Sequence, residues 1–174
     1  AYLDSAATSQ RPLRVLDTER SFLERDNAAV HRGTSQAVGS ATERFESARA
    51  AVASFVGAAT PEQVVWAAGA TDALNIVALG IGEANAGLGV RGSERFALAP
   101  GDEILVTESE HHANLIPWQR LAAKTGATFT YIPVDEFGTW SIDAARAAIN
   151  SRTRIFAFTH VSNVTGFEAP VAEL

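Results

Sequence analysis

Cysteine and methionine are both missing from this chain of 174 residues. Without cysteine, the chain can form no disulfide, bind no metal through thiolate and supply no thiol nucleophile. Also missing is any run of roughly 18 to 20 consecutive apolar residues, the length that a membrane-spanning helix needs. The amino terminus lacks the basic and then apolar pattern of a signal peptide. We therefore expect a soluble cytoplasmic protein with no membrane partner.

Long runs of like charge are absent too. The chain has 14 lysine and arginine residues against 20 aspartate and glutamate residues, a net charge of −6. Because nucleic-acid binding needs clustered basic residues, this balance argues against nucleic acid as a partner. Apolar residues, by contrast, make up 47% of the chain, enough for the core of one ordinary domain. The lack of methionine and the start at Ala1 lead us to expect a fragment of a longer protein.

Helices and strands are expected to alternate over most of the chain. Apolar residues at three- and four-residue steps predict two helices, over residues 12–26 and 40–56, separated by a polar loop. From residue 61 on, short apolar strands alternate with helical patterns. The expected strands are 63–67, 103–107, 128–132 and 154–159, and the expected helices are 72–81, 115–124 and 141–150, with a short helix near 93–98.

This alternation is typical of the α/β class, with a mainly parallel sheet covered by helices on both faces. We divide the chain into a helical segment with an active-site loop, residues 1–60, and the first part of an α/β domain, residues 61–174. In such sheets ligands bind beyond the carboxyl ends of the strands. Three loops follow expected strands, at 69–71, 109–112 and 160–163, so we expect them to converge.

The first of these loops, Gly69-Ala70-Thr71, precedes an expected helix. The free amides and the positive dipole end of a helix amino terminus suit a bound phosphate, and the Thr71 hydroxyl adds a donor. On spacing alone, a simple helix cap explains the same residues equally well.

The second loop contains two adjacent histidines, His111 and His112. Adjacent side chains point in different directions, so the pair is a poor chelate and a metal site is not expected. A histidine at a strand end can instead stack on a planar ring or exchange a proton with a substrate. The alternative is that both rings cap a helix or fill a subunit interface. Asn163, in the third loop, offers an amide donor or is merely a polar strand end.

Five short motifs cover nearly the whole chain. They are Tyr2-Leu3-Asp4-Ser5-Ala6-Ala7-Thr8, Val30-His31-Arg32-Gly33, Gly69-Ala70-Thr71-Asp72, Glu110-His111-His112-Ala113-Asn114 with Pro117-Trp118, and Thr159-His160-Val161-Ser162-Asn163. Their order and spacing resemble those of the class V aminotransferases, and most of all the SufS-type cysteine desulfurases and selenocysteine lyases. The resemblance implies a fold-type I pyridoxal-phosphate enzyme, truncated here, that usually acts as a homodimer.

The resemblance also implies roles for single residues. His111 matches the histidine that stacks on the pyridoxal ring and takes part in proton transfer. Asn163 matches the residue that hydrogen-bonds the 3-oxygen side of the ring and helps to place the substrate carboxylate. Ala70 and Thr71 match the phosphate-binding turn. That turn commonly reads Gly-Thr-Thr-Glu in the family but ends on Asp72 here, and Ala70 removes one hydroxyl contact.

Residues on the substrate side, with less defined individual roles, are also implied by the resemblance. They are Ala6, Ala7, His31 and Arg32. The Schiff-base lysine and the persulfide-forming cysteine of the family are expected after Leu174. The chain's single lysine, Lys124, lies in an expected helix without the family's flanking pattern, so we expect it to be a surface residue.

The implied activity is that of a pyridoxal-phosphate-dependent cysteine desulfurase. Such an enzyme converts L-cysteine to L-alanine and passes the sulfur, as an enzyme persulfide, to an acceptor protein for iron-sulfur cluster assembly. A selenocysteine lyase or another class V enzyme is an alternative, and a noncatalytic phosphate-binding or dimerising module is another. We expect the chain alone to be inactive and to bind the cofactor weakly.

Overall fold

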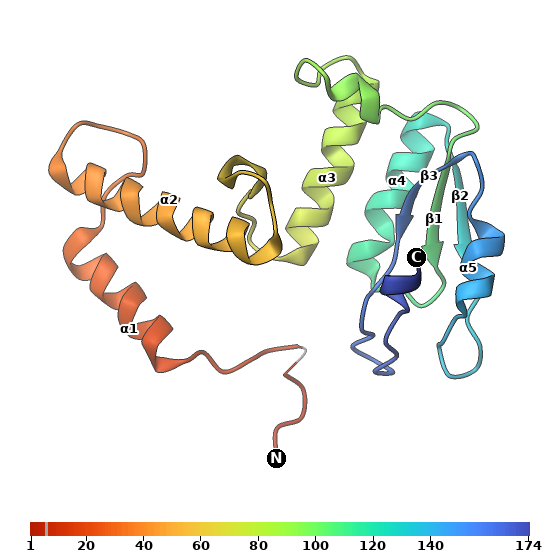
Figure 1. Cartoon of the computed structure of the whole chain (residues 1–174), viewed down its shortest axis with the longest axis horizontal. Coiled ribbons are helices and arrows are strands. Elements are labelled where there is room, and N and C mark those ends of the chain that lie inside the picture. Colours follow the sequence, from red (N-terminus) through yellow and green to blue (C-terminus); the bar gives the residue numbers. More distant parts are fainter. Residues whose placement is uncertain (6) are drawn as a thin grey trace. The chain divides into compact units, whose positions relative to one another are not determined.

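The computed structural model describes residues 1–5 and 7–174. It divides into two compact units, residues 1–66 and residues 67–174. Figure 1 shows the first unit as helices joined by loops and the second as a small sheet covered by helices. Among the described residues, no helix has the length and apolar character needed to cross a membrane.

Unit 1 is built on two helices. Helix α1, Leu13–Ser21, continues into a π-helical turn, Phe22–Asp26, which confirms the helix expected over these residues. Helix α2 spans Gln36–Val56 and so begins earlier than the expected residue 40. The reason is local, because the Ser35 hydroxyl accepts a hydrogen bond from the Val38 amide at 3.4 Å and caps the helix there. The helix ends at Gly57, whose φ of +70° is the left-handed conformation that glycine tolerates best.

The strand expected at residues 63–67 is not formed. Residues Pro61–Gln63 make a short 3-10 turn, closed by a capping box between Thr60 and Gln63. Val64 has extended backbone angles, φ −95° and ψ 119°, but residues 64–67 pair with no strand in the part of the chain that the structure describes. Alternating apolar residues predict an extended backbone, and they carry no information on whether a partner strand is present.

The sheet of unit 2 has three parallel strands in the order β2-β1-β3. Strands β1, Glu103–Thr107, and β2, Thr128–Ile132, have the expected bounds, whereas β3, Thr153–Ala157, ends before the expected residue 159. The central strand β1 is buried along its whole length, because it has a neighbour on each side and a helix layer on each face.

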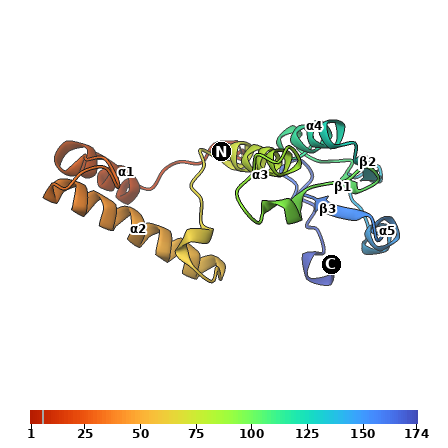
Figure 2. The ribbon, with the colours of Figure 1, turned by 90° about the horizontal axis from the view of Figure 1, so that it is seen from above.

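Helices cover both faces of this sheet, as expected (Figures 1 and 2). Helices α3, Ala70–Asn85, and α4, Ile116–Thr125, cover one face, and α5, Ile142–Ala148, covers the other. Side chains of β1 alternate between the two layers. The first layer contains Ala78, Leu98, Ile104, Val106, Trp118, Leu121 and Ala122, and the second contains Leu105, Ile132, Trp140, Ala145 and Ala169.

All three strands run in one direction, so their carboxyl ends lie at one edge of the sheet. Helices α3 and α4 begin at this carboxyl edge (Figure 1). The segment after β3 turns back on itself as a hairpin, in which the Ala169 amide donates to the His160 carbonyl at 2.7 Å and the Ser162 amide donates to the Phe167 carbonyl at 2.9 Å. No pattern in the sequence indicates this hairpin.

Candidate active site

Glu110 is the centre of a hydrogen-bond network at the carboxyl edge. It follows β1 closely and is only 9% exposed. Its Oε1 accepts from the Thr107 hydroxyl at 2.6 Å and from the Thr159 backbone amide at 2.8 Å. Its Oε2 accepts from the Thr159 hydroxyl at 2.8 Å and from the Asn114 side-chain amide at 2.7 Å. One carboxylate therefore joins the ends of β1 and β3 to the start of α4.

The Asn114 side chain is held from two sides. Its amide nitrogen donates to Glu110, and its Oδ1 accepts from the indole N–H of the buried Trp118 at 2.9 Å. This pair of contacts fixes which end of the amide faces the carboxylate. The buried Trp118 thus anchors the turn that carries the two histidines.

His111 lies between this network and the solvent. Its Nδ1 accepts a hydrogen bond from the Ala113 backbone amide at 3.0 Å, and its side chain is exposed. The neighbouring His112 ring is also exposed, with its centroid 6.3 Å from that of His111 and the two planes inclined at 62°. The two rings therefore face different directions, as expected, and the His111 side chain is exposed near the carboxyl edge.

The turn before α3 offers backbone donors. Gly69 is the cap residue, and the first intrahelical bond is donated by the Ala73 amide to the Gly69 carbonyl at 3.0 Å. The amides of Ala70 and Thr71 precede that bond and have no carbonyl acceptor within the helix. The Asp72 carboxylate reaches back to accept from the Ala68 amide at 3.0 Å. The turn does not follow a strand, contrary to expectation, but it does begin a helix of 16 residues.

Asn163 lies in the hairpin that follows β3. The hydroxyl of the preceding Ser162 accepts from the amides of Val164 and Thr165 at 3.3 and 3.2 Å, and the Gly166 amide donates to the Ser162 carbonyl at 2.9 Å. These bonds close a tight turn around Asn163 and leave its side chain exposed.

The three expected loops gather at the carboxyl edge. Glu110 bonds directly to Thr159 and so ties the histidine loop to the segment that leads into the hairpin. Helix α3 contacts the turn His112–Asn114, and its amino-terminal end lies at the same edge (Figure 1). His111, Asn163 and the turn at Thr71 are therefore carried by neighbouring segments of unit 2.

Candidate residues on the substrate side lie in unit 1. His31 has a left-handed backbone, φ +58°, which is uncommon for residues other than glycine. Its Nε2 lies 2.8 Å from Glu46 Oε1, and its amide donates to the Thr42 hydroxyl at 3.0 Å. Arg32 is exposed next to it.

The remaining substrate-side candidates lie near the amino terminus. Ala7 donates its amide to the Asp4 carbonyl at 3.1 Å and is exposed. Ala6 lies outside the described residues.

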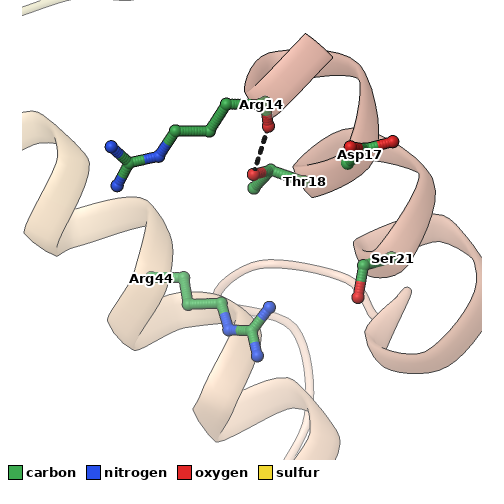
Figure 3. Close-up of a pocket in the computed structure, with 5 residues that line it drawn as sticks. All are labelled: Arg14, Asp17, Thr18, Ser21 and Arg44. Atoms are coloured by element: carbon green, nitrogen blue, oxygen red, sulfur yellow. Dashed lines mark hydrogen bonds between the residues drawn. The ribbon is translucent and has the colours of Figure 1, made fainter.

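A hollow between α1 and α2 is lined by two arginines, Arg14 and Arg44, that extend toward the opposite helix (Figure 3). Their charges are offset locally, because Arg44 pairs with Asp26 at 3.0 Å and Asp17 also lines the hollow. The Thr18 hydroxyl already donates a hydrogen bond to the Arg14 backbone carbonyl at 2.7 Å. The hollow is therefore a poor anion site compared with the turn before α3.

Lys124 is a surface residue, as expected. It lies in the last turn of α4, away from the carboxyl edge at which that helix begins. Its side chain is 52% exposed, and its Nζ lies 3.6 Å from Glu83 Oε1.

Glu110 is the main residue that the sequence analysis does not single out. The available signal is an acidic residue three positions after the last residue of a buried strand, Thr107, with a second threonine, Thr159, shortly after β3. A carboxylate at such a place needs several donors, because burial without them is costly. Sequence periodicity alone does not show that Thr159, 49 positions away, supplies two of them.

Comparison with known proteins places this arrangement in a family. A cysteine desulfurase of Cronobacter sakazakii is 41% identical over 174 residues, which are 100% of this chain and 40% of that protein. A protein of Mycobacterium leprae named probable cysteine desulfurase 2 is 47% identical over 174 residues, which are 100% of this chain and 39% of that protein. The apo structure of a cysteine desulfurase from Thermococcus onnurineus matches with a TM-score of 0.85 and 34% identity, over 99% of this chain and 39% of that one.

The chain thus spans about 40% of the length of the relatives that it matches. The match to the family is continuous over residues 1–174. The expected fold class is confirmed as well, since the solved structures most like this one are α/β proteins of the same kind. The chain belongs to the class V aminotransferase family, and its most similar relatives are cysteine desulfurases.

Proposed function

We infer that the chain forms part of a pyridoxal-phosphate-dependent cysteine desulfurase, which converts L-cysteine to L-alanine and passes the sulfur as a persulfide to an acceptor protein for iron-sulfur cluster assembly. The observation that carries this proposal is the gathering of an exposed histidine ring and an amide-rich helix start at one edge of a parallel sheet. Cysteine desulfurases are also the relatives most similar to the chain. A cytoplasmic location and a homodimer are part of the same proposal.

The donors at the carboxyl edge fit a phosphorylated planar cofactor. The amides of Ala70 and Thr71 have no acceptor within α3, and the Thr71 side chain is exposed. A phosphate there interacts favourably with the positive end of the helix dipole. The Asp72 carboxylate accepts from the Ala68 amide at 3.0 Å, which precedes the first two amides of the helix. The loss of a hydroxyl at Ala70 therefore leaves the backbone donors in place.

His111 and Asn163 supply the contacts to the ring. The exposed His111 ring would stack on the cofactor ring. The exposed Asn163 amide would donate to the 3-oxygen side and help to orient the substrate carboxylate. Ala6, Ala7, His31 and Arg32 are proposed, from the resemblance alone, as residues of the substrate side. When bound, pyridoxal phosphate supplies an electron-withdrawing ring that stabilises negative charge on the substrate. The nucleophilic cysteine and the Schiff-base lysine are not supplied by this chain, which has no cysteine and only Lys124.

Expression of the complete coding sequence that contains these residues tests the proposal. We expect a yellow protein that releases alanine and sulfide from L-cysteine. His111→Ala is expected to lower kcat/KM by about 100-fold, because misplacing a reacting group by about 1 Å has an effect of that size. The exposed Glu136 provides the control, and Glu136→Ala should keep the full rate.

The same preparation separates the alternatives. A selenocysteine lyase would turn over L-selenocysteine and leave L-cysteine unchanged. A colourless product that yields no alanine from either substrate would point to a noncatalytic module and exclude the desulfurase.

A further inference from the structure

Glu110 connects two segments of unit 2 that are distant in the sequence. One is the histidine loop, residues 108–114, and the other is the Asn163 hairpin with the residues that lead into it, 158–169. The Thr159 backbone amide donates to Glu110 Oε1 at 2.8 Å, and the Thr159 hydroxyl donates to Oε2 at 2.8 Å. Because hydrogen bonds are directional, two bonds that end on different oxygens of one carboxyl group fix the orientation of the contact as well as its length.

Backbone pairing does not make this connection. The last paired residues of β1 and β3 are Val106 and Ala157. Beyond them, no backbone hydrogen bond joins residues 108–114 to residues 158–169 in the part of the chain that the structure describes. The Glu110 side chain therefore continues the link between the two segments past the end of the sheet, where the ladder of the strands no longer sets their spacing.

The Glu110 carboxyl group is fully occupied by contacts within the chain. Besides the bonds from Thr159, Oε1 accepts from the Thr107 hydroxyl at 2.6 Å and Oε2 accepts from the Asn114 side-chain amide at 2.7 Å. Each oxygen thus accepts two hydrogen bonds, which is the capacity of a carboxyl oxygen. Glu110 has no acceptor position left for a substrate or cofactor, so it acts through the residues that it holds.

We propose that Glu110 is a positioning residue that, by holding Thr159, sets the placement of the Asn163 hairpin relative to the histidine loop. Its consequence for the reaction rests on the proposed function, in which His111 and Asn163 both contact the cofactor ring. Glu110 directly precedes His111, and Thr159 lies shortly before Asn163. The bonds between Glu110 and Thr159 therefore determine whether one ring can meet both side chains. The link itself is a property of this chain and is measured without the cofactor.

Amide hydrogen exchange of the complete protein, prepared without cofactor and followed by mass spectrometry, measures how firmly the hairpin is held. Thr159→Val removes one hydroxyl donor to Glu110 and nearly preserves the shape of the side chain. The bond that it removes breaks whenever the hairpin opens. Exchange of residues 160–169 should therefore become about fivefold faster, the factor that corresponds to one hydrogen bond of typical net strength. Thr159→Ser keeps the hydroxyl and should restore the slow exchange.

Thr107→Val is the matched control. Thr107 is buried, and its hydroxyl donates to the same carboxyl group, so its variant removes the same kind of donor. Thr107 and Glu110 belong to β1 and the turn after it, and their bond persists when the hairpin opens. The exchange of residues 160–169 should therefore stay as in the wild type. Glu110→Gln replaces an acceptor oxygen by an NH2 group that faces two donors, and it should speed the exchange by more than Thr159→Val does.

Equal acceleration by Thr159→Val and Thr107→Val would overturn the proposal, because the network would then contribute only general stability. So would unchanged exchange in Thr159→Val, even where Glu110→Gln fails to fold.

Turnover of cysteine is measured separately. In an active enzyme, Glu110→Gln should lower kcat/KM by about 100-fold, as a displacement of about 1 Å does, and Thr159→Val should lower it by less, with Thr159→Ser close to the wild type. An active enzyme with an unchanged rate in Glu110→Gln would count against the positioning role. An inactive protein that shows the expected exchange supports this inference and counts against the proposed function alone.

Discussion

Two glutamates border the central strand β1, and both are buried. Glu103 is 5% exposed, and its Oε1 accepts from the Asn150 side-chain amide at 3.0 Å and from the Thr153 hydroxyl at 3.1 Å. Its Oε2 lies 3.6 Å from Arg152 Nη2. Glu110, near the other end, accepts hydrogen bonds from hydroxyl and amide groups, all of them neutral, within the described residues. A buried carboxylate needs a full set of donors to offset the loss of hydration. Both residues meet this need, but only Glu110 does so beside the candidate site.

Asp135 permits a test of electrostatics at the scale of one residue. The pKa of the Asp135 carboxyl is lowered below its ordinary value. The largest cause is the Thr139 hydroxyl, which donates to Asp135 Oδ2 at 2.6 Å, and the second largest is the Thr139 backbone amide. A carboxyl whose pKa is lower in the folded state stabilises the protein above its unfolded pKa, near pH 4, and this stabilisation is lost as the pH falls through the folded pKa.

Thr139→Val should therefore raise the pKa of Asp135 toward its ordinary value. NMR titration of the Asp135 side chain measures it directly. The variant should also weaken the dependence of unfolding on pH below about pH 4. An unchanged titration midpoint in Thr139→Val would show that the hydroxyl does not stabilise the charged form.

At the scale of elements, helix caps explain several helix boundaries. Helix α5 begins where the Ser141 hydroxyl accepts from the Ala144 amide at 3.1 Å. Ser141→Ala should lower the free energy of unfolding by about 1 kcal/mol, the usual effect of removing a cap, and Ser141→Asp should restore most of it. Urea denaturation measures both variants. Ser151 is an exposed serine in a nearby turn, and an equal loss in Ser151→Ala would contradict the assignment to the cap.

Helices and strands that are defined by a local pattern of apolar and turn residues could be predicted from the sequence. Elements that form only by pairing with a distant segment of the chain could not. The strands β1 and β2 have the expected bounds, because a short apolar run between turn residues is sufficient to define a buried strand. The segment 63–67 has a similar pattern but pairs with no strand in the described residues. The hairpin after β3 cannot be predicted for the same reason, since it depends on the hydrogen bond from the Ala169 amide to the His160 carbonyl, which leaves no periodic pattern.

The candidate site shows the same division. Motifs in the sequence were enough to single out His111, Asn163 and the turn at Thr71, whose roles stay predictions. The network that joins two of their loops depends on Glu110 and Thr159, which are far apart in the sequence. Contacts between distant polar residues leave no periodic pattern, so only the structure reveals them.

At the scale of the whole molecule, helix α3 has an unusual surface. A helix at the surface of a globular protein normally has one apolar face, but α3 has apolar side chains on its outer side as well. Ile76, Val77 and Leu79 are 44%, 52% and 62% exposed. The strands β2 and β3 are also edge strands of the three-stranded sheet. Exposed apolar patches and unpaired edges both favour association between chains.

We therefore expect the chain to self-associate as its concentration rises, with α3 taking part. Sedimentation velocity over a range of concentrations should show a rising average sedimentation coefficient, and Leu79→Glu should reduce that rise because it places a charge in the apolar patch. Ala147→Glu, on the exposed side of α5, adds the same charge elsewhere and should leave the rise unchanged. Equal effects of the two substitutions would mean that net charge, and not the α3 surface, controls association. A sedimentation coefficient that stays constant in the wild type would show that these apolar side chains do not drive association in solution.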